Sequence, residues 1–394
     1  MKRVLITGAT GFIGGRLAEV LTGLGVEVVC PVREWGRASR LARLPVRMVG
    51  ADVLNAVSIR DAMAGCDVAI HCAADFRAAG PKHQETSHRG TANVMEAALG
   101  AGVSRVVHLS SAAVHGLSPR GPRPPTEDTP LRRTGHDYCD GKIAAEQVAL
   151  QFHRSRGLPV SIIRPTVVYG PFGYYSRSVV RVARERRLVL VDGGAGICNC
   201  LYVDNLVQAI LLAATRREAI GEVITVSDAV PVTWREYLEK HAEALGPGFA
   251  RLPIISRAGL RAARRRLSGA ALTVLLRSPR DAFDKLDDPV IREAVQAIPG
   301  ATALGIVTKP LLRLFRRRTP PAETRRPATS GDHEVARAKG LARLLSPNEE
   351  ESFSVFQHVR FGIDKAKRLL GYQPAVGFEE GMARTASWIR WAGL

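Results

Sequence analysis

Short apolar runs alternate with helical patterns through the first part of the chain. Runs of strand length lie at 3–7, 26–30, 46–49, 68–70, 106–109 and 160–163. Between them, apolar residues recur at helical spacing over 12–24, 84–100 and 137–155. Strands that alternate with helices in this way predict an α/β fold with a parallel, doubly wound sheet.

The pattern becomes irregular after residue 170. Helices are predicted over 204–215 and 233–245, and a final helix over 378–391. Between the last two, residues 257–343 hold 19 lysines and arginines against 8 aspartates and glutamates, in a chain of net charge +19. We interpret this basic insert as a helical cap with a solvated surface. Peripheral contact with an anionic membrane is the alternative, and nucleic acid is the least favoured partner because no recognised motif is present.

Composition narrows the class of protein further. The 394 residues suffice for two or three domains, or for one large domain with additions. Six cysteines form no disulfide framework for this length, and Cys198 and Cys200 are too close together for a zinc pair, so reduced thiols and no metal are expected. The sequence begins without a signal peptide and has no apolar run of the ~18 residues that span a membrane. A cytoplasmic protein is expected, membrane-associated only if the basic insert binds lipid.

The segment after the first strand carries three glycines at a spacing typical of phosphate binding. Residues 7–14 read TGATGFIG, between a strand and a helix. Glycines let the backbone turn tightly and approach a pyrophosphate, and the helix N-terminus offers N–H groups to the anion. This context predicts a dinucleotide-binding loop, with a purely structural turn as the alternative. The candidate contacts are Gly8, Thr10, Gly11, Phe12, Ile13 and Gly14.

The residue after the second strand bears on the choice of cofactor. A carboxylate there binds the ribose 2′-hydroxyl of NAD(H), whereas an arginine accommodates the 2′-phosphate of NADP(H). This chain has Arg33, with no acid before Glu34. The sequence therefore favours NADP(H) over NAD(H), unless Arg33 is merely a solvated surface residue.

Three side chains predict proton transfer beside a hydride carrier. Tyr138 and Lys142 are four residues apart on the predicted helix 137–155, so both lie on one side of it. A phenol has an ordinary pKa near ~10, and an ammonium one turn away stabilises the phenolate. Ser111 follows the strand 106–109, whose carboxyl end should open on the cofactor crevice. A hydroxyl there can bind a carbonyl or alcohol oxygen, although an ordinary helix-surface pair remains the alternative for Tyr138 and Lys142.

With these motifs in chain order, the sequence resembles the extended short-chain dehydrogenase/reductases of the NAD-dependent epimerase/dehydratase family. The likeness covers 1–215 and resumes at about 353–391. It implies a Rossmann-type domain over 1–170, to which 199–230 return. It also implies a smaller, mostly helical substrate-binding part over 171–198 and 231–394, which includes the basic insert. A homodimer is plausible by the same resemblance.

The resemblance implies further roles at the site. Asp52, beside Val53, would contact the adenine amino group, and Pro165 and Val168 would border the nicotinamide. The adenosine would be lined by Cys72, Ala73 and Ala74. In the reducing direction Tyr138 would supply the proton to the carbonyl oxygen and Ser111, rather than Ser110, would orient that oxygen. Lys142 would lower the tyrosine pKa and hold the nicotinamide ribose, so that Tyr138 and Lys142 also belong to the cofactor site.

Departures from the family pattern bear on the substrate. The family often has an asparagine at the position that matches Ser87. Nucleotide-sugar members usually carry an asparagine where Val167 stands and an arginine near Cys198, and both polar groups are absent here. Without such groups a diphosphate would lack charge-assisted partners. Residues 202–205 (YVDN) are similar to the 3β-hydroxysteroid dehydrogenase branch, and the ending of the second strand resembles dihydroflavonol reductases. The sequence therefore favours interconversion of an alcohol and a ketone on a mostly apolar small molecule. A nucleotide-sugar epimerase or dehydratase, and a non-catalytic dinucleotide-binding sensor or scaffold, are the alternatives.

Overall fold

The computed structural model describes residues 1–74, 86–119, 124–228, 230–260, 262 and 347–394. Contacts group the chain into two compact units. Unit 1 comprises Met1–Val180, Ala195–Ala250 and Glu351–Leu394, and unit 2 comprises Arg181–Gly194 and Arg251–Glu350. Nearly all of the basic insert 257–343 lies outside the described residues, so its role as a cap or a membrane contact stays a prediction. Among the described helices, none has the length and apolar content needed to cross a membrane.

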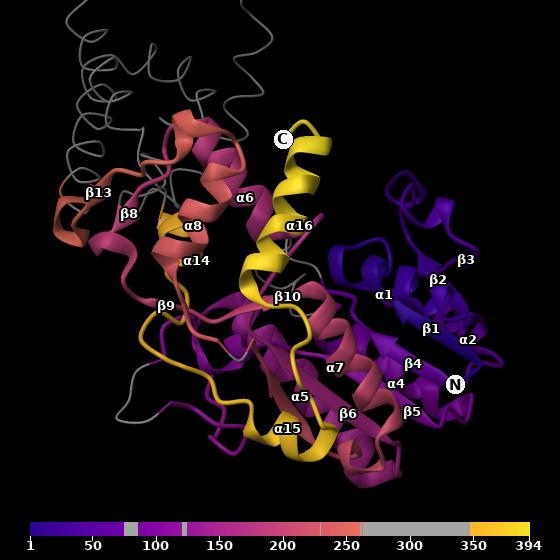
Figure 1. The fold of residues 1–394 in the computed structure, drawn as a ribbon. Helices are drawn as coiled ribbons and strands as arrows, with labels where there is room; N and C mark the ends of the chain where they lie inside the picture. Colours follow the sequence, from indigo (N-terminus) through magenta and orange to yellow (C-terminus); the bar gives the residue numbers. More distant parts are fainter. Residues whose placement is uncertain (75–85, 120–123, 229, 261, 263–346) are drawn as a thin grey trace, which may run out of the picture. The chain divides into compact units, whose positions relative to one another are not determined.

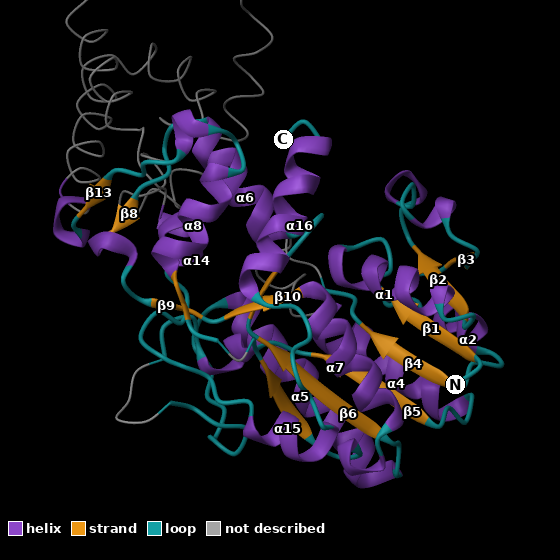
Figure 2. Cartoon of the chain, viewed as in Figure 1, coloured by secondary structure: helices purple, strands orange, loops and turns teal. Residues whose placement is uncertain are grey.

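Seven parallel strands form the central sheet of unit 1 (Figures 1 and 2). Their order is β11 (Val223–Val226), β6 (Val160–Pro165), β5 (Arg105–Leu109), β4 (Val68–His71), β1 (Arg3–Thr7), β2 (Glu27–Val32) and β3 (Arg47–Gly50). The chain runs outward from β1 to β3, crosses to β4, and then runs outward on the other side. The predicted Rossmann-type sheet is thereby confirmed, and its crevice opens where β1 and β4 end side by side at Thr7 and His71.

Helices cover both faces of this sheet. One face packs, with Val4 and Ile6, against α1 (Phe12–Gly23), α7 (Val203–Thr215) and α15 (Asp364–Leu370). The other face packs, with Leu5, against α2 (Ala56–Met63), α4 (Thr91–Gly100) and α5 (Asp137–Arg156). Successive strand residues point to opposite faces, and here both faces are buried. This is why the strands are continuous apolar runs rather than alternating ones.

The structure departs from the predicted elements at several places. The predicted helix 84–100 is, within the described residues, a wide π-type turn over Thr86–Gly90 followed by α4. The last strand of the sheet, β11, was not predicted, and neither were α15 and α6 (Tyr174–Arg184). β11 is a short run that lies beyond residue 170, where the alternation of strands and helices that marked the other strands becomes irregular. Only its pairing with β6, from Val223 opposite Ile162 to Val226 opposite Pro165, makes it part of the sheet.

Smaller elements complete the two units. In unit 1, β7 (Val167–Tyr169) runs parallel to β10 (Cys200–Tyr202), and β9 (Ile197–Cys198) pairs antiparallel with β12 (Val232–Thr233). The helix α8 (Trp234–Glu243) starts at a capping box in which Thr233 and Glu236 satisfy each other's backbone N–H. The chain closes on α16 (Phe378–Trp391). In unit 2, β8 (Leu190–Val191) pairs with β13 (Ile254–Ile255).

Candidate active site

The glycine loop connects β1 to α1 and has no room for side chains. Gly8 has φ +72°, and a Cβ there would lie 2.8 Å from the Ala73 nitrogen. A Cβ on Gly14 would lie 2.5 Å from the Gly8 carbonyl oxygen. The Gly11 N–H donates to that same oxygen at 2.9 Å. Glycine is therefore required at both ends of the loop, by the backbone turn at Gly8 and by close packing at Gly14.

The start of α1 fits the pyrophosphate of a dinucleotide. The first N–H groups of a helix have no acceptor within the helix. In α1 the N-cap is Gly11, with no side-chain cap, and the first turn holds no acidic residue. Backbone donors and the positive end of the helix dipole are thus left for an anion. The individual contacts of Thr10, Phe12 and Ile13 stay predictions.

A buried chain of hydrogen bonds holds residues 72–74 against this loop. The Thr7 hydroxyl lies 2.7 Å from His71 Nδ1 and accepts the Ala73 N–H at 3.2 Å. His71 Nε2 lies 3.2 Å from the Thr91 hydroxyl. Burial, aided by the Lys142 charge, lowers the pKa of His71 to about 3, so the ring stays neutral. Sequence reasoning placed Cys72, Ala73 and Ala74 at the adenosine but missed the histidine and threonines that position them.

The structure places the other predicted adenosine contacts at the carboxyl ends of β2 and β3. The Asp52 carboxylate accepts the Leu54 N–H at 3.0 Å, and Asn93 Nδ2 donates to the Val53 carbonyl at 2.8 Å. Arg33 pairs with Glu34 at 2.9 Å, with side chains 47% and 53% exposed. So exposed an ion pair is weak and exchangeable. Glu34 therefore lies beside the position at which the sequence predicts the choice between a ribose hydroxyl and a phosphate.

Ser111, Tyr138 and Lys142 come together where β5 ends. Ser111 caps the short helix η4 (Ala112–His115), and its hydroxyl accepts the Ala113 N–H at 3.1 Å. Tyr138, in the first turn of α5, forms a side-chain hydrogen bond with Ser111. One turn later, Lys142 Nζ donates to the Leu109 carbonyl at 2.8 Å. The strand end and the helix thus present a hydroxyl, a phenol and an amine at one place.

Burial dominates the acid–base properties of this set. It raises the pKa of Tyr138 to about 12, against the opposing hydrogen bond from Ser111. It lowers the pKa of Lys142 to about 8, against the charges of Cys72 and Glu146. Lys142 is not among the causes that shift the Tyr138 pKa, and its ammonium donates to the Leu109 carbonyl. For Lys142 to lower the pKa of Tyr138, as the sequence predicts, its ammonium would have to turn toward the phenol.

A buried ion pair that sequence reasoning missed fixes α5 beside the strand ends. Arg164 Nε donates to Glu146 Oε1 at 2.9 Å, and its Nη2 donates to Oε2 at 2.7 Å. The side chains are 3% and 1% exposed. The Ser110 hydroxyl donates to the same carboxylate. The sequence holds a sign of this pair. Glu146 follows Lys142 by one helical turn, and Arg164 is a charged residue within a mostly apolar strand, where a buried partner is needed.

The positions expected near the nicotinamide and the substrate lie on β6, β7 and β9. Pro165 ends β6 beside Val226, Val168 lies in β7, and its neighbour Val167 is buried. Asn199 is next to Cys198, but its side-chain amide already forms hydrogen bonds with the protein backbone. It donates to the Val359 carbonyl at 2.7 Å and accepts the Phe361 N–H at 3.1 Å. Neither Val167 nor Cys198 brings a charged group to this region.

The sequence and the fold were compared with known proteins. The model of the NAD dependent epimerase/dehydratase family matches residues 4–227, more than half of the chain. A Stigmatella aurantiaca protein, 4-hydroxy-2-methyl-3-oxo-4-farnesyl-3,4-dihydroquinoline-1-oxide ketoreductase, is 30% identical over 249 residues, which cover 62% of this chain and 73% of the relative. The 2-alkyl-3-oxoalkanoate reductase of Shewanella oneidensis is 27% identical over 270 residues, covering 64% and 69%.

Solved structures show the same fold at lower identity. A dTDP-glucose 4,6-dehydratase from Streptomyces venezuelae, with NAD and TYD bound, superposes with a TM-score of 0.64 and 21% identity. The superposition covers 99% of this chain and 97% of the dehydratase. At this level of identity the likeness concerns the fold alone.

Proposed function

The chain belongs to the NAD-dependent epimerase/dehydratase family, and within it we propose an oxidoreductase that interconverts an alcohol and a ketone on a mostly apolar small molecule. The observation that carries the proposal is the contact of Tyr138 with Ser111 at the end of β5, with Lys142 one turn away. Relatives named for ketone reduction support the reaction class. The apolar Val167 and the self-satisfied Asn199 favour an apolar substrate over a diphosphate.

In the proposed mechanism the protein supplies the proton and orients the oxygen. When bound, the nicotinamide supplies or accepts the hydride. The Tyr138 phenol donates its proton to the carbonyl oxygen, and the Ser111 hydroxyl donates a hydrogen bond to that oxygen. Lys142, with a pKa of about 8, is largely protonated at neutral pH and can stabilise the phenolate that remains. The Glu146–Arg164 pair holds the helix that carries both groups.

For the cofactor we propose NADP(H) in preference to NAD(H). Arg33 follows β2 directly and presents a half-exposed guanidinium at the edge of the sheet where the adenosine ribose is expected. A planar guanidinium can bind a 2′-phosphate through two parallel hydrogen bonds. The phosphate would displace Glu34 from its exposed pairing with Arg33, at little cost.

The test of the proposed function is NADPH-dependent reduction of a panel of apolar ketones by wild type and Tyr138→Phe. We expect the phenol-less variant to lose about 10²–10⁴-fold in kcat while its NADPH dissociation constant stays within about twofold. Tyr174→Phe, at an exposed tyrosine, is the matched control and should keep wild-type turnover. Full activity of Tyr138→Phe would overturn the catalytic role. Conversion of a nucleotide sugar without net NADPH consumption would overturn the reaction type.

A further inference from the structure

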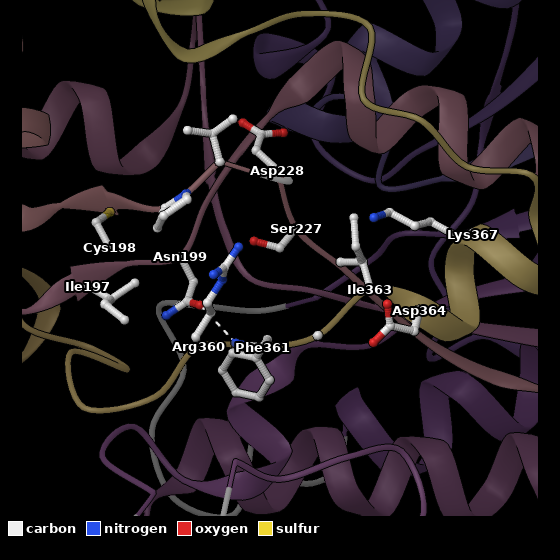
Figure 3. A pocket seen from close by; sticks show the side chains of 13 residues that line it. Ile197, Cys198, Asn199, Ser227, Asp228, Arg360, Phe361, Ile363, Asp364 and Lys367 are labelled. Carbon is white, nitrogen blue, oxygen red and sulfur yellow. Dashed lines mark hydrogen bonds between the residues drawn. The ribbon is translucent and has the colours of Figure 1, made fainter.

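Unit 1 contains a pocket of about 240 Å³ that belongs neither to the glycine loop nor to the Ser111–Tyr138–Lys142 set. Residues from three segments line it: 197–199, then 227, 228, 230 and 231 after β11, and 360–364 with Lys367 of α15 (Figure 3). Drug-sized ligands occupy ~300–1,000 Å³, so this pocket suits a smaller molecule.

Two cations reach the same space from different segments. In Figure 3 the Lys367 ammonium and the Arg360 guanidinium point toward the middle of the pocket from opposite sides, with the Ser227 hydroxyl between them. Lys365, on the same helix, pairs with Glu222 at 2.8 Å. Within the described part of the chain, Lys367 has no such acidic partner. The Ser227 hydroxyl reaches the Cys200 carbonyl only at 3.3 Å, a long bond that it can exchange for a better acceptor.

Two carboxylates line the pocket, the exposed Asp364 and the partly buried Asp228, and Asp228 already has hydrogen-bond partners in the protein. The Asp228 carboxylate accepts the Tyr202 N–H at 3.0 Å and the Asn205 amide at 2.7 Å. Burial raises the pKa of Asp228 to about 7, and neither Arg360 nor Lys367 is among the causes of the shift. The two cations therefore do not serve to neutralise Asp228, and near pH 7 that carboxyl repels an anion only in part.

We propose that this pocket binds a phosphate group, free or carried by a small molecule, through Lys367, Arg360 and Ser227. Guanidinium and ammonium groups form short, charge-assisted hydrogen bonds to phosphate oxygens, and a hydroxyl completes the set as a neutral donor. Phosphate itself occupies a small part of the volume, which leaves room for a short substituent. This site is additional to the dinucleotide phosphates expected at the start of α1.

The test is calorimetric titration of the full-length protein with inorganic phosphate and, in parallel, with glycerol 3-phosphate. NADP⁺ is present at saturation, so that the glycine loop does not contribute. We expect one site per chain. Lys367→Gln should weaken the affinity about tenfold or more, and Lys367→Arg should restore most of it. Arg360→Gln should also weaken binding.

Arg368→Gln is the matched control, because Arg368 is an exposed cation on the same helix that does not line the pocket. It should bind as wild type does. Tighter binding of glycerol 3-phosphate would indicate a phosphorylated metabolite, and equal binding would indicate free phosphate. Absence of binding by wild type would overturn the proposal. So would equal losses in Lys367→Gln and Arg368→Gln, because these would reflect only the overall charge.

Discussion

At the residue scale, the acid–base groups of the site are set by burial as much as by their neighbours. The spacing of Tyr138 and Lys142 predicted that they share one side of a helix, and the structure adds the Ser111 contact and the Leu109 carbonyl. Burial penalises the charged form of each group, so the pKa of the phenol rises and that of the ammonium falls. The pKa of the phenol thus lies above that of the ammonium. As pH rises, Lys142 therefore loses its proton before Tyr138 does, so a phenolate beside an ammonium is not the favoured state of the pair. In the proposed mechanism, Lys142 would have to turn from the Leu109 carbonyl toward the phenol before it could stabilise the phenolate.

Arg33→Asp tests the cofactor preference at this scale. Replacing the guanidinium with a carboxylate removes the expected partner of the 2′-phosphate and adds repulsion. We expect the NADPH affinity to fall at least about tenfold, or ~1.4 kcal/mol, while the NADH affinity is kept or improved. Fluorescence titration of both cofactors measures this, with Arg60→Asp at an exposed residue of α2 as the control. An unchanged NADPH dissociation constant would reject the role of Arg33.

At the element scale, α5 carries two of the three side chains that the proposed mechanism uses. Tyr138, Lys142 and Glu146 follow one another at four-residue intervals on this helix, and therefore on one side. The first two face the end of β5, while Glu146 is held by Arg164 on β6 and by Ser110. The helix is thus held by a buried carboxylate one turn after Lys142.

Arg164→Met tests how strongly this anchor matters. It leaves the buried Glu146 charge without its partner, so we expect a loss of ~3–5 kcal/mol in the free energy of unfolding. The control is Arg156→Met on the same helix. Its pair with Glu96 has side chains 46% and 59% exposed, and its removal should cost no more than about 1 kcal/mol. Urea unfolding compares the two variants, and similar losses in both would show that Arg164 is not an anchor.

At the scale of the whole molecule, the C-terminal segment of unit 1 is hydrogen-bonded to α7, one of the helices that cover the sheet. Asn205, on α7, donates to the Val376 carbonyl at 2.8 Å and accepts the Val376 N–H at 3.0 Å. The same amide donates to Asp228 after β11. Asp228 is thus placed, partly buried, where three distant parts of the chain meet. Its burial therefore depends on the packing of these parts together.

Asp228 should make stability depend on pH. Burial raises its pKa in the fold to about 7, from an ordinary 3.8. Between these values the folded protein keeps a proton that the unfolded chain has lost, so this residue's contribution to stability falls as pH rises. We expect wild type to lose ~1–2 kcal/mol between pH 5 and 7 through this group, and Asp228→Asn to lack that loss. Urea unfolding at both pH values, with Asp61→Asn at an exposed site as control, measures the difference. Identical pH dependence in wild type and Asp228→Asn would contradict it.

The sequence by itself determined what local patterns can encode. Apolar periods placed the first six strands of the sheet and its principal helices, the glycines marked a turn that tolerates no Cβ, and a four-residue spacing aligned Tyr138 with Lys142. Each of these signals involves residues close together in the chain. Over such short stretches, the regular geometry of a helix or strand determines which side of the element a residue lies on. The tertiary structure alone decided that β11 joins the sheet, that α15 packs against one face of it, and that Arg164 pairs with Glu146. It also decided that the Asn199 amide forms its hydrogen bonds with the backbone of residues 359–361, and that Lys367 and Ser227 line the same pocket. Those outcomes depend on pairing and burial between residues far apart in the chain, and no local period records them.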